Sequence, residues 1–303
     1  MIMTVDMGGT KTLCGFWEGG RLLEKKKFAT ASIPDFTQLL FRLTQGRNLE
    51  SLCIAAAGPV TEDRAELSNA SRVLHVDALR GTLADIPHIA VINDLEALGY
   101  SLSSLEESQL SLFRKGCPAQ GAKAVISIGT GLGVSAVTRE GIVMPSEGGH
   151  MDFAPQDPQQ QKLLSALWEE YGHVSYERLL SGQGLANLYF ALTGRRTAPE
   201  QVTQSAKAGA PEAREALKLF TRILAAFCGS CALVFMAAGG IYLGGGVMPK
   251  ILPLLDKDLF EEAYLCKGRL RGTLSRIPVY VILDEAAPSL GAAVYASRLS
   301  AAL

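Results

Sequence analysis

The chain has 303 residues, of which 48% are hydrophobic and 19% charged, with a formal net charge of -1. This composition, with 31 glycines spread along the chain, is typical of a folded globular protein and excludes a disordered or fibrous one. A net charge near zero gives no positive field that would draw the chain onto nucleic acid or anionic lipid, so we expect neither as a partner. The length suggests two domains, each large enough to bury an apolar core.

Three strands are predicted at the start of the chain. Residues 2–28 show a strand, a glycine turn and two further strands, because β-branched and aromatic residues continue beyond the turn. The charged run 25–27 is expected on an exposed sheet edge rather than in a binding patch. Asp6 interrupts the apolar start, which argues against a secretory signal, so we expect a cytoplasmic protein.

Helices and strands then alternate. A helix pattern begins at Ile33, and residues 51–60 form a short apolar strand that ends in a Gly-Pro turn. The next strand passes into a helix at Asn93 and Asp94. This alternation predicts a largely parallel sheet.

Residues 123–144 repeat the strand, glycine turn and strand of the opening, so the chain is expected to contain two related halves. Further helices are expected at residues 159–171, 176–192, 199–208, 212–238, 248–255 and 289–299. Two further strands are expected at residues 241–243 and 278–283. The last helix, with its glycine and alanines, is expected to pack back on the first domain. The predicted domains are therefore a small one, residues 1–94 plus 287–303, and a large one, residues 95–286.

The segment between Arg222 and Lys250 carries no charge and is long enough to span a bilayer. Five glycines divide it, so a buried helix followed by a strand is favoured, and we expect no membrane contact. Cys228 and Cys231 have the spacing of a redox motif. They lie well inside the expected helix, among small residues, which favours a structural role. The other four cysteines stand singly and indicate neither a disulfide framework nor a zinc site.

Two glycine turns, at residues 8–10 and 129–133, are candidate phosphate sites. Neither has the spacing of a Walker loop or a dinucleotide fingerprint, and each is followed by a strand instead of a helix. Glycine allows backbone N–H groups to approach an anion, and Thr10 and Thr130 add hydroxyl donors, so together the turns suit a polyphosphate. An ordinary hairpin turn is the alternative for either turn alone. Asp6, beside the first turn, suggests Mg²⁺ held mainly through water and phosphates.

The motif SEGGHMD, residues 146–152, sets Glu147 and His150 three positions apart. A carboxylate and an imidazole at this spacing suit a metal site, an acid/base pair or a ligand rich in hydroxyls. The metal interpretation is disfavoured because no further ligands cluster nearby in the sequence. Hydroxyl groups both donate and accept hydrogen bonds, which matches the donors and acceptors of this pair.

In their order, these motifs resemble the fold of sugar kinases, heat-shock proteins and actin, and more closely the bacterial glucokinase family. The resemblance covers nearly the whole chain. It rests on the segments VDMGGTKT, AAAGPV, VINDLEALGY, ISIGTGLGVS, SEGGHMDFAP, GHVSYERLLSGQGLANLY and IYLGGGVMPK. It implies a two-domain α/β protein with the actin-like ATPase (ribonuclease H-like) fold, with mixed sheets flanked by helices and an interdomain cleft.

The resemblance implies roles at matching positions. Asp94 resembles the catalytic base, and the alternative for it is the N-cap of the helix that follows, a position that Asn93 is also suited to fill. The residues that resemble hexose ligands are Asn69, Asn93, Glu147, His150 and Glu177. The residues that resemble nucleotide contacts are Asp6, Gly8, Gly9, Thr10, Lys11, Thr130, Gly131, Gly244, Gly245 and Gly246. Gly148 and Gly149 are expected to let their loop lie against the sugar ring. His173 is assigned a structural role, and a solvated charge on a helix is the alternative for Glu177.

These roles predict an enzyme that uses ATP and Mg²⁺ to phosphorylate the 6-hydroxyl of a hexose, with glucose as the expected substrate. A kinase for glucosamine, mannose or an N-acetylhexosamine is one alternative, because hydroxyl pockets differ little in sequence. A sugar-binding regulator without catalysis is the other, but Asp94 and both glycine turns are retained and no DNA-reading helix precedes the first strand. The segment after SEGGHMD has no cysteines, so zinc is not expected. The family inclines us toward a homodimer.

Overall fold

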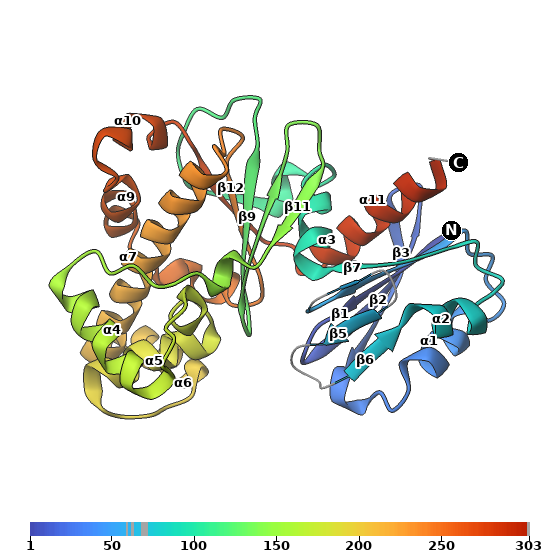
Figure 1. Cartoon of the computed structure of the whole chain (residues 1–303), viewed down its shortest axis with the longest axis horizontal. Helices are drawn as coiled ribbons and strands as arrows, with labels where there is room; N and C mark the ends of the chain where they lie inside the picture. Colours follow the sequence, from blue (N-terminus) through green and yellow to red (C-terminus); the bar gives the residue numbers. More distant parts are fainter. Residues whose placement is uncertain (59, 62–63, 68–71, 302–303) are drawn as a thin grey trace. The chain divides into compact units, whose positions relative to one another are not determined.

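A computed structural model of the chain describes residues 1–58, 60–61, 64–67 and 72–301 (Figure 1). The chain divides into two compact units, which are described separately below. Unit 1 comprises Met1–Glu106, Gly141–Pro145 and Asp284–Leu303, and unit 2 comprises Glu107–Glu140 and Ser146–Leu283. Residues 95–106, expected from the sequence in the large domain, therefore cluster with unit 1.

Unit 1 is built on a five-stranded sheet in the order β3-β2-β1-β4-β7. The strands are β1 (Ile2–Met7), β2 (Lys11–Glu18), β3 (Arg21–Ala29), β4 (Ser51–Ala56) and β7 (His88–Asn93). β2 is antiparallel to β1 and β3, whereas β1, β4 and β7 are parallel, so the sheet is mixed. The predicted opening of three strands is confirmed, and the lysine run lies on β3, at the edge of the sheet.

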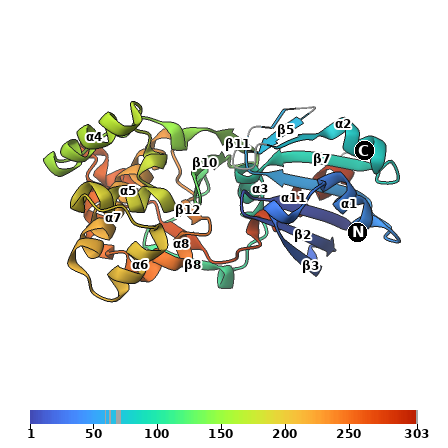
Figure 2. The same ribbon diagram turned by 90° about the horizontal axis from the view of Figure 1, so that it is seen from below.

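Helices cover both faces of this sheet, and the alternation of side chains along β4 shows how. Leu52 and Ile54 face the core formed with α1 (Phe36–Thr44) and α2 (Val76–Thr82). Cys53 and Ala55 face the other core, formed with α3 (Asp94–Ser101) and α11 (Ala287–Ala301). Figure 2 shows α3 and α11 beside one another.

α3 and α11 pack closely because their contact is lined by small residues. A Cβ atom on Gly291 would overlap the carbonyl oxygen of Ala97, so only glycine fits there. The expected packing of the last helix through its glycine and alanines is thus confirmed. A short antiparallel pair, β5 (Arg64–Leu67) and β6 (Arg72–His75), was not predicted from the sequence.

The strands of unit 2 belong to a six-stranded sheet in the order β11-β10-β9-β12-β13-β8, in which only Ser146 of the edge strand β11 clusters with unit 2 and residues 143–145 cluster with unit 1. The strands are β8 (Leu110–Arg114), β9 (Lys123–Ile128), β10 (Leu132–Val137), β11 (Val143–Ser146), β12 (Ile241–Gly244) and β13 (Val279–Ile282). β10 is antiparallel to β9, and β12 is parallel to both β9 and β13. The order β11-β10-β9-β12-β13 repeats the order β3-β2-β1-β4-β7 of unit 1, which confirms the expected two related halves.

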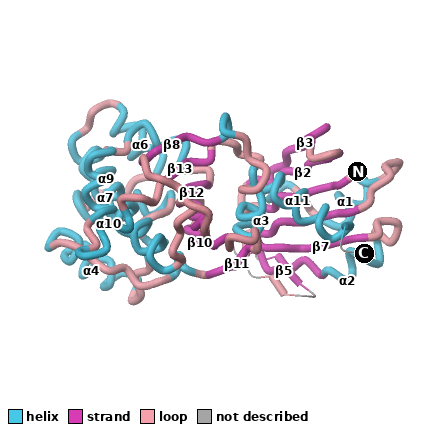
Figure 3. Tube along the Cα trace, turned by 90° about the horizontal axis from the view of Figure 1, so that it is seen from above, coloured by secondary structure: helices cyan, strands magenta, loops and turns pink. Residues whose placement is uncertain are grey.

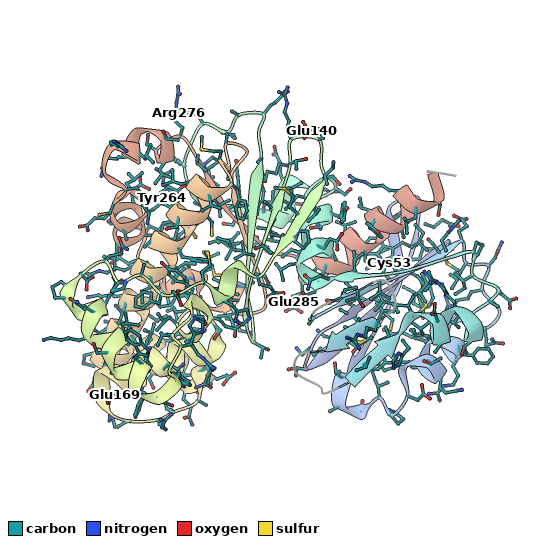
Figure 4. All side chains as sticks on the ribbon, viewed as in Figure 1. Cys53, Glu140, Glu169, Tyr264, Arg276 and Glu285 are labelled. Atoms are coloured by element: carbon teal, nitrogen blue, oxygen red, sulfur yellow. The ribbon has the colours of Figure 1, made fainter. Side chains whose placement is uncertain are left out.

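Helices gather on one side of the strands of unit 2 and form the larger core with them (Figure 3). They are α4 (Pro158–Tyr171), α5 (Gly182–Thr193), α6 (Pro199–Lys207), α7 (Pro211–Val234), α8 (Met248–Ile251), α9 (Lys257–Leu265) and α10 (Arg271–Leu274). α7 is the central helix of this core, and Tyr264 on α9 is fully buried within it (Figure 4).

Three of the helix predictions are wrong in extent. The helix expected at residues 248–255 is α8, which ends at Ile251 and is followed by a 3₁₀ turn, Leu252–Leu254. The helix expected at residues 176–192 is a 3₁₀ turn, Tyr176–Arg178, followed by α5, because the Ser181 hydroxyl caps a new helix by accepting the Gly184 N–H. The helix expected to reach residue 238 ends at Val234, and Met236 then adopts a left-handed conformation with φ of 46°.

The second half of α7, residues 223–234, is the first part of the uncharged segment discussed above. Among the described residues α7 is the one helix whose length and composition would allow it to cross a membrane, and 72% of its apolar window is buried inside the fold. Cys228 and Cys231 lie on it with side chains 0% and 2% exposed, so a solvent-accessible redox pair is excluded. Burial raises the pKa of Cys231 to about 12 and that of Cys228 well above its usual value.

Candidate active site

In unit 1, three parallel strands end at one edge of the sheet. The register pairs Met7 with Ala56 and Ala56 with Asn93, so the first glycine turn and Asp94 follow these strands at the same level. The Gly58 carbonyl is tied to this edge because it accepts a hydrogen bond of 3.0 Å from Asn93 Nδ2. The carboxyl edge of a parallel sheet is where α/β proteins place their ligands.

The first glycine turn is a tight hairpin between β1 and β2. Gly8 N–H donates to the Lys11 carbonyl at 3.0 Å, and a Cβ on Gly8 would lie only 3.0 Å from that oxygen. Thr30 holds the turn from β3's end, since its hydroxyl donates to the Gly8 carbonyl at 2.7 Å and its N–H to the Thr10 carbonyl at 3.0 Å. The Thr10 and Lys11 side chains stay exposed. The sequence offered no sign of Thr30, which is distant along the chain.

Asn93 resolves the choice between the two possible helix caps. Its Oδ1 accepts the Leu95 N–H at 2.8 Å and it is the N-cap of α3, while Asp94 is the first helical residue. Asp94 Oδ1 also accepts from Leu95 N–H, at 2.9 Å. Asn93 is therefore the cap, and both its Oδ1 and its Nδ2 form hydrogen bonds. Asp94 is half-buried at the edge of the sheet.

Two carboxyl groups at this edge, those of Asp6 and Asp94, are close enough for their charges to interact. Burial, and secondly the negative charge of Asp94, raise the pKa of Asp6 from 3.8 to about 7. Burial and the charge of Asp94 therefore both destabilise the ionised form of Asp6. A cation or a proton bound beside the two carboxylates would relieve their repulsion.

In unit 2, the second glycine turn joins β9 to β10 and is held from several sides. Gly129 N–H donates to the Gly131 carbonyl at 2.9 Å, and the Gly129 carbonyl accepts from Gly182 N–H, at the start of α5, at 3.0 Å. Thr130, at the tip, is exposed. The prediction of a strand after this turn is confirmed by β10.

The third glycine turn, residues 244–246, lies beside the second. β12 pairs with β9 so that Gly244 is level with Ser127, and Val247 N–H donates to the Ile128 carbonyl at 3.0 Å. Gly245 has φ of 90°, a conformation that favours glycine, and a Cβ there would overlap the backbone of Ile128. Both features exclude a side chain at this position. Two of the three predicted nucleotide segments thus share one edge of this sheet.

The loop with Glu147 and His150 follows β11. Glu147 precedes a 3₁₀ turn, Gly148–His150, and the carboxylate Oε2 lies 3.9 Å from His150 Nε2. Both side chains are exposed, at 75% and 56%, so they are available to a ligand. A Cβ on Gly149 would overlap the Leu132 carbonyl oxygen of β10, so packing within the protein itself requires a glycine there, and the expected contact of this loop with a sugar ring stays a prediction.

Glu177 lies in a segment paired with this loop. Phe153 N–H donates to the Val174 carbonyl and Tyr176 N–H to the Met151 carbonyl, at 2.9 and 3.0 Å. The Glu177 carboxylate is half-buried, and its Oε2 accepts the Leu132 N–H at 3.0 Å. The alternative of a solvated helix charge is therefore wrong for Glu177.

His173 and Asp152 lie at the exposed end of the same paired segment. His173 Nε2 is 2.8 Å from Asp152 Oδ1, which gives this histidine a partner in the protein and agrees with its structural assignment. Asn69 lies outside the described residues. Among the residues that are described, no group of three or more His, Cys, Asp and Glu side chains is placed to hold a metal ion.

The comparisons with known proteins agree on one family. The family model described as glucokinase matches residues 3–299. The chain belongs to the glucokinase family. It is 38% identical over 306 residues to a glucokinase of Yersinia enterocolitica, covering 96% of this chain and 94% of the relative. It is 33% identical over 340 residues to a glucokinase of Nostoc punctiforme, covering 99% of both chains.

Solved structures extend the likeness to the glucokinase fold. A glucokinase from an Antarctic psychrotroph has a TM-score of 0.87 with this chain, at 25% identity and 98% coverage of both chains. A ROK family glucokinase from Streptomyces griseus, solved in complex with glucose and AMPPNP, has a TM-score of 0.67 at 22% identity and covers 98% of this chain and 99% of its own. The predicted α/β fold of the actin-like ATPase class is confirmed, as is the glucokinase family.

Proposed function

We propose that this member of the glucokinase family transfers the γ-phosphoryl group of ATP to the 6-hydroxyl of a hexose, with glucose as the preferred substrate. The observation that carries the proposal is the family match over residues 3–299. It is supported by relatives that are glucokinases over their whole length and by a related structure that holds glucose and AMPPNP.

Asp94 is the proposed catalytic base. It begins α3 at the carboxyl edge of the parallel strands of unit 1, where a carboxylate is able to accept the proton of the attacking hydroxyl and orient its oxygen. That Asn93 serves as the helix cap supports this role, because Asp94 is not required for the start of α3.

The hexose ligands proposed in unit 2 are Glu147, His150 and Glu177, and in unit 1 Asn93, with Asn69 outside the described residues. Carboxylates accept from sugar hydroxyls, and a neutral imidazole both donates and accepts, so the set suits a ring with hydroxyls on adjacent carbons. The exposure of Glu147 and His150 supports this assignment.

The proposed nucleotide contacts are the three glycine turns with Asp6 and Lys11. They include Gly8, Gly9, Thr10, Thr130, Gly131, Gly244, Gly245 and Gly246. Mg²⁺ fits the chemistry at Asp6, because a carboxyl with a pKa of about 7 beside Asp94 is stabilised as an anion by a nearby cation. When bound with ATP, the ion would neutralise phosphate charge.

We also propose that the enzyme is cytoplasmic and forms a homodimer. Light scattering tests the dimer, for which the expected mass is near twice the chain's 32.3 kDa.

A substrate panel tests the assignment of the hexose. ADP release is measured with ATP, Mg²⁺ and glucose, mannose, glucosamine or N-acetylglucosamine, for the wild type and for Glu147→Gln. We expect the highest kcat/KM with glucose, and a Glu147→Gln variant whose KM for glucose rises more than its kcat falls. A higher kcat/KM with another hexose would reassign the substrate, and sugar binding without ADP release would indicate a regulator.

A further inference from the structure

The Glu177 carboxylate is bonded to the second glycine turn, besides its proposed role toward the hexose. Its Oε2 accepts the N–H of Leu132, the first residue of β10 after the turn, at 3.0 Å. The same oxygen lies 2.5 Å from the position that a Cβ on Gly131 would take. The carboxylate therefore lies directly against the turn proposed to contact phosphates.

The rest of the Glu177 segment holds the other end of the turn. Gly182 N–H donates to the Gly129 carbonyl at 3.0 Å. The Ser181 hydroxyl donates to the Glu177 carbonyl at 2.9 Å, which ties the carboxylate-bearing residue to the start of α5. Residues 177–182 thus hold both ends of the glycine turn through hydrogen bonds.

Glu147 provides a contrast. It lies in the other hexose-binding segment, and its carboxylate pairs with His150 inside its own loop. The loop touches β10 through Gly149, whose backbone packs on the Leu132 carbonyl. Only the Glu177 carboxylate, among the proposed hexose ligands of unit 2 described here, has a hydrogen bond to the residue that follows the turn.

We propose that Glu177 is a positioning residue that couples hexose binding to nucleotide binding. One carboxylate oxygen holds the Leu132 N–H while the other receives a hexose hydroxyl, so a bound hexose fixes the carboxylate and, through it, the turn. This inference rests on the proposed function, because it takes glucose and ATP as the ligands. A glycine turn that the bound hexose has already ordered does not have to be ordered again when the nucleotide binds. Each ligand therefore increases the affinity for the other by the same factor.

The experiment measures this factor in the full-length protein by calorimetry. The Kd of AMPPNP with Mg²⁺ is determined without glucose and at saturating glucose, and the ratio of the two is the coupling factor. For the wild type we expect a factor of about 5 to 150, the usual range for coupled sites. For Glu177→Ala we expect a factor close to one, and weaker AMPPNP binding without glucose, because the turn loses its hydrogen bond.

Two further variants separate coupling from simple loss of a hexose ligand. Glu177→Gln keeps a carbonyl oxygen for the Leu132 N–H, so AMPPNP binding without glucose should match the wild type while the coupling factor falls. Glu147→Gln should weaken glucose binding and leave the coupling factor unchanged once glucose is saturating. Because Glu177→Gln preserves the hydrogen bond to the turn, it also serves if Glu177→Ala does not fold.

A wild-type factor of one, or an unchanged factor in Glu177→Ala or Glu177→Gln, would overturn the coupling. So would a loss of coupling in Glu147→Gln equal to that in the Glu177 variants. In each of these cases the wild type still releases ADP with glucose, which distinguishes them from failure of the proposed function, in which the wild type releases no ADP with any hexose.

Discussion

At the scale of single residues, Asn93 caps α3 and Asp94 is the proposed catalytic base, whereas the sequence left open which of the two residues caps the helix. We expect Asp94→Asn to lower kcat by about 10²- to 10⁴-fold, the usual contribution of a general base, because an amide does not accept the hydroxyl proton. The thermal midpoint should stay close to that of the wild type, since Asn93 caps α3. ADP release and thermal unfolding measure the two effects.

Asp35→Asn is the matched control for this substitution. Asp35 caps α1 by accepting the Gln38 N–H at 3.0 Å, and asparagine serves equally well at that position. Its kcat should therefore equal that of the wild type. Near-normal turnover in a folded Asp94→Asn protein would remove Asp94 from the role of base.

Asp6 predicts a pH dependence of stability. Its pKa is 3.8 in the unfolded chain and about 7 in the folded one, so the folded state binds the proton more tightly. The stability gained is fully present below pH 3.8 and is lost as the pH rises through 7. In Asp6→Asn this loss should be absent. We expect its free energy of unfolding, in EDTA without nucleotide, to exceed the wild type's by about 4 kcal/mol above pH 8 and to match it near pH 4.

Urea unfolding at a series of pH values checks this expectation. If the wild type and Asp6→Asn lost stability in parallel between pH 4 and pH 8, the carboxyl would not have the raised pKa. Added Mg²⁺ and ATP should stabilise the wild type more than Asp6→Asn at neutral pH, because the ionised carboxylate then has a cation beside it.

The sequence identifies residues with distinctive chemistry but not their distant partners. Asn93 was predicted as a possible cap because Leu95 is its neighbour, whereas its bond to the Gly58 carbonyl spans 35 positions. The bond from Leu132 to Glu177 spans 45 positions and has no local signature. Contacts of this kind depend on the packing of whole elements, which spacing within one motif does not show.

At the scale of elements, the loop with Glu147 and His150 depends on its contact with β10. We expect Gly149→Ala to displace the loop, because its Cβ would overlap the Leu132 carbonyl oxygen. Misplacement of the two side chains should raise the KM for glucose by about 10- to 100-fold. Overpacking should also lower the free energy of unfolding by about 1–3 kcal/mol.

Gly272→Ala controls for the loss of a glycine, because no heavy atom lies within 4 Å of a Cβ there. It should change neither KM nor stability appreciably. Glucose kinetics and urea unfolding of the two variants provide the comparison. A Gly149→Ala enzyme with the wild-type KM would show that the close approach to β10 does not position the loop.

Thiol accessibility follows from the placement of the cysteines. Cys117 and Cys266 are exposed, whereas Cys14, Cys53, Cys228 and Cys231 are buried, and Cys53 lies on β4 beneath α11 (Figure 4). A thiol reagent at pH 8 should therefore modify two thiols rapidly in the folded protein and all six in denaturant. Mass spectrometry identifies the sites, and rapid labelling of Cys228 or Cys231 would contradict the buried helix.

Long elements were predictable because their periodicity is strong. The opening strands, α4 and α6 lie within a residue or two of their expected positions. The short strands β5, β6, β8 and β11 were missed, because four or five residues carry little pattern and their pairing partners are remote. The helix expected through residues 176–192 failed at Ser181, where a hydroxyl cap starts α5 after a separate 3₁₀ turn.

At the scale of the whole molecule, one strand order occurs twice. In each unit a glycine turn follows the middle strand of the five in this order, at Gly8 after β1 and at Gly129 after β9. This repetition was predicted because the strand, glycine turn and strand recur in the sequence. The sequence predicted the return of residues 287–303 to the first domain, whereas residues 95–106 and 141–145, which were expected in the large domain, cluster with unit 1.

The most direct test of the central claim is the fate of the hexose 6-hydroxyl. The enzyme is incubated with ATP, Mg²⁺ and either glucose or 6-deoxyglucose, ADP is measured, and glucose 6-phosphate is detected with its dehydrogenase. We predict one glucose 6-phosphate for each ADP with glucose, and neither product above background with 6-deoxyglucose. ADP release with 6-deoxyglucose, or ADP release from glucose without glucose 6-phosphate, would contradict the account.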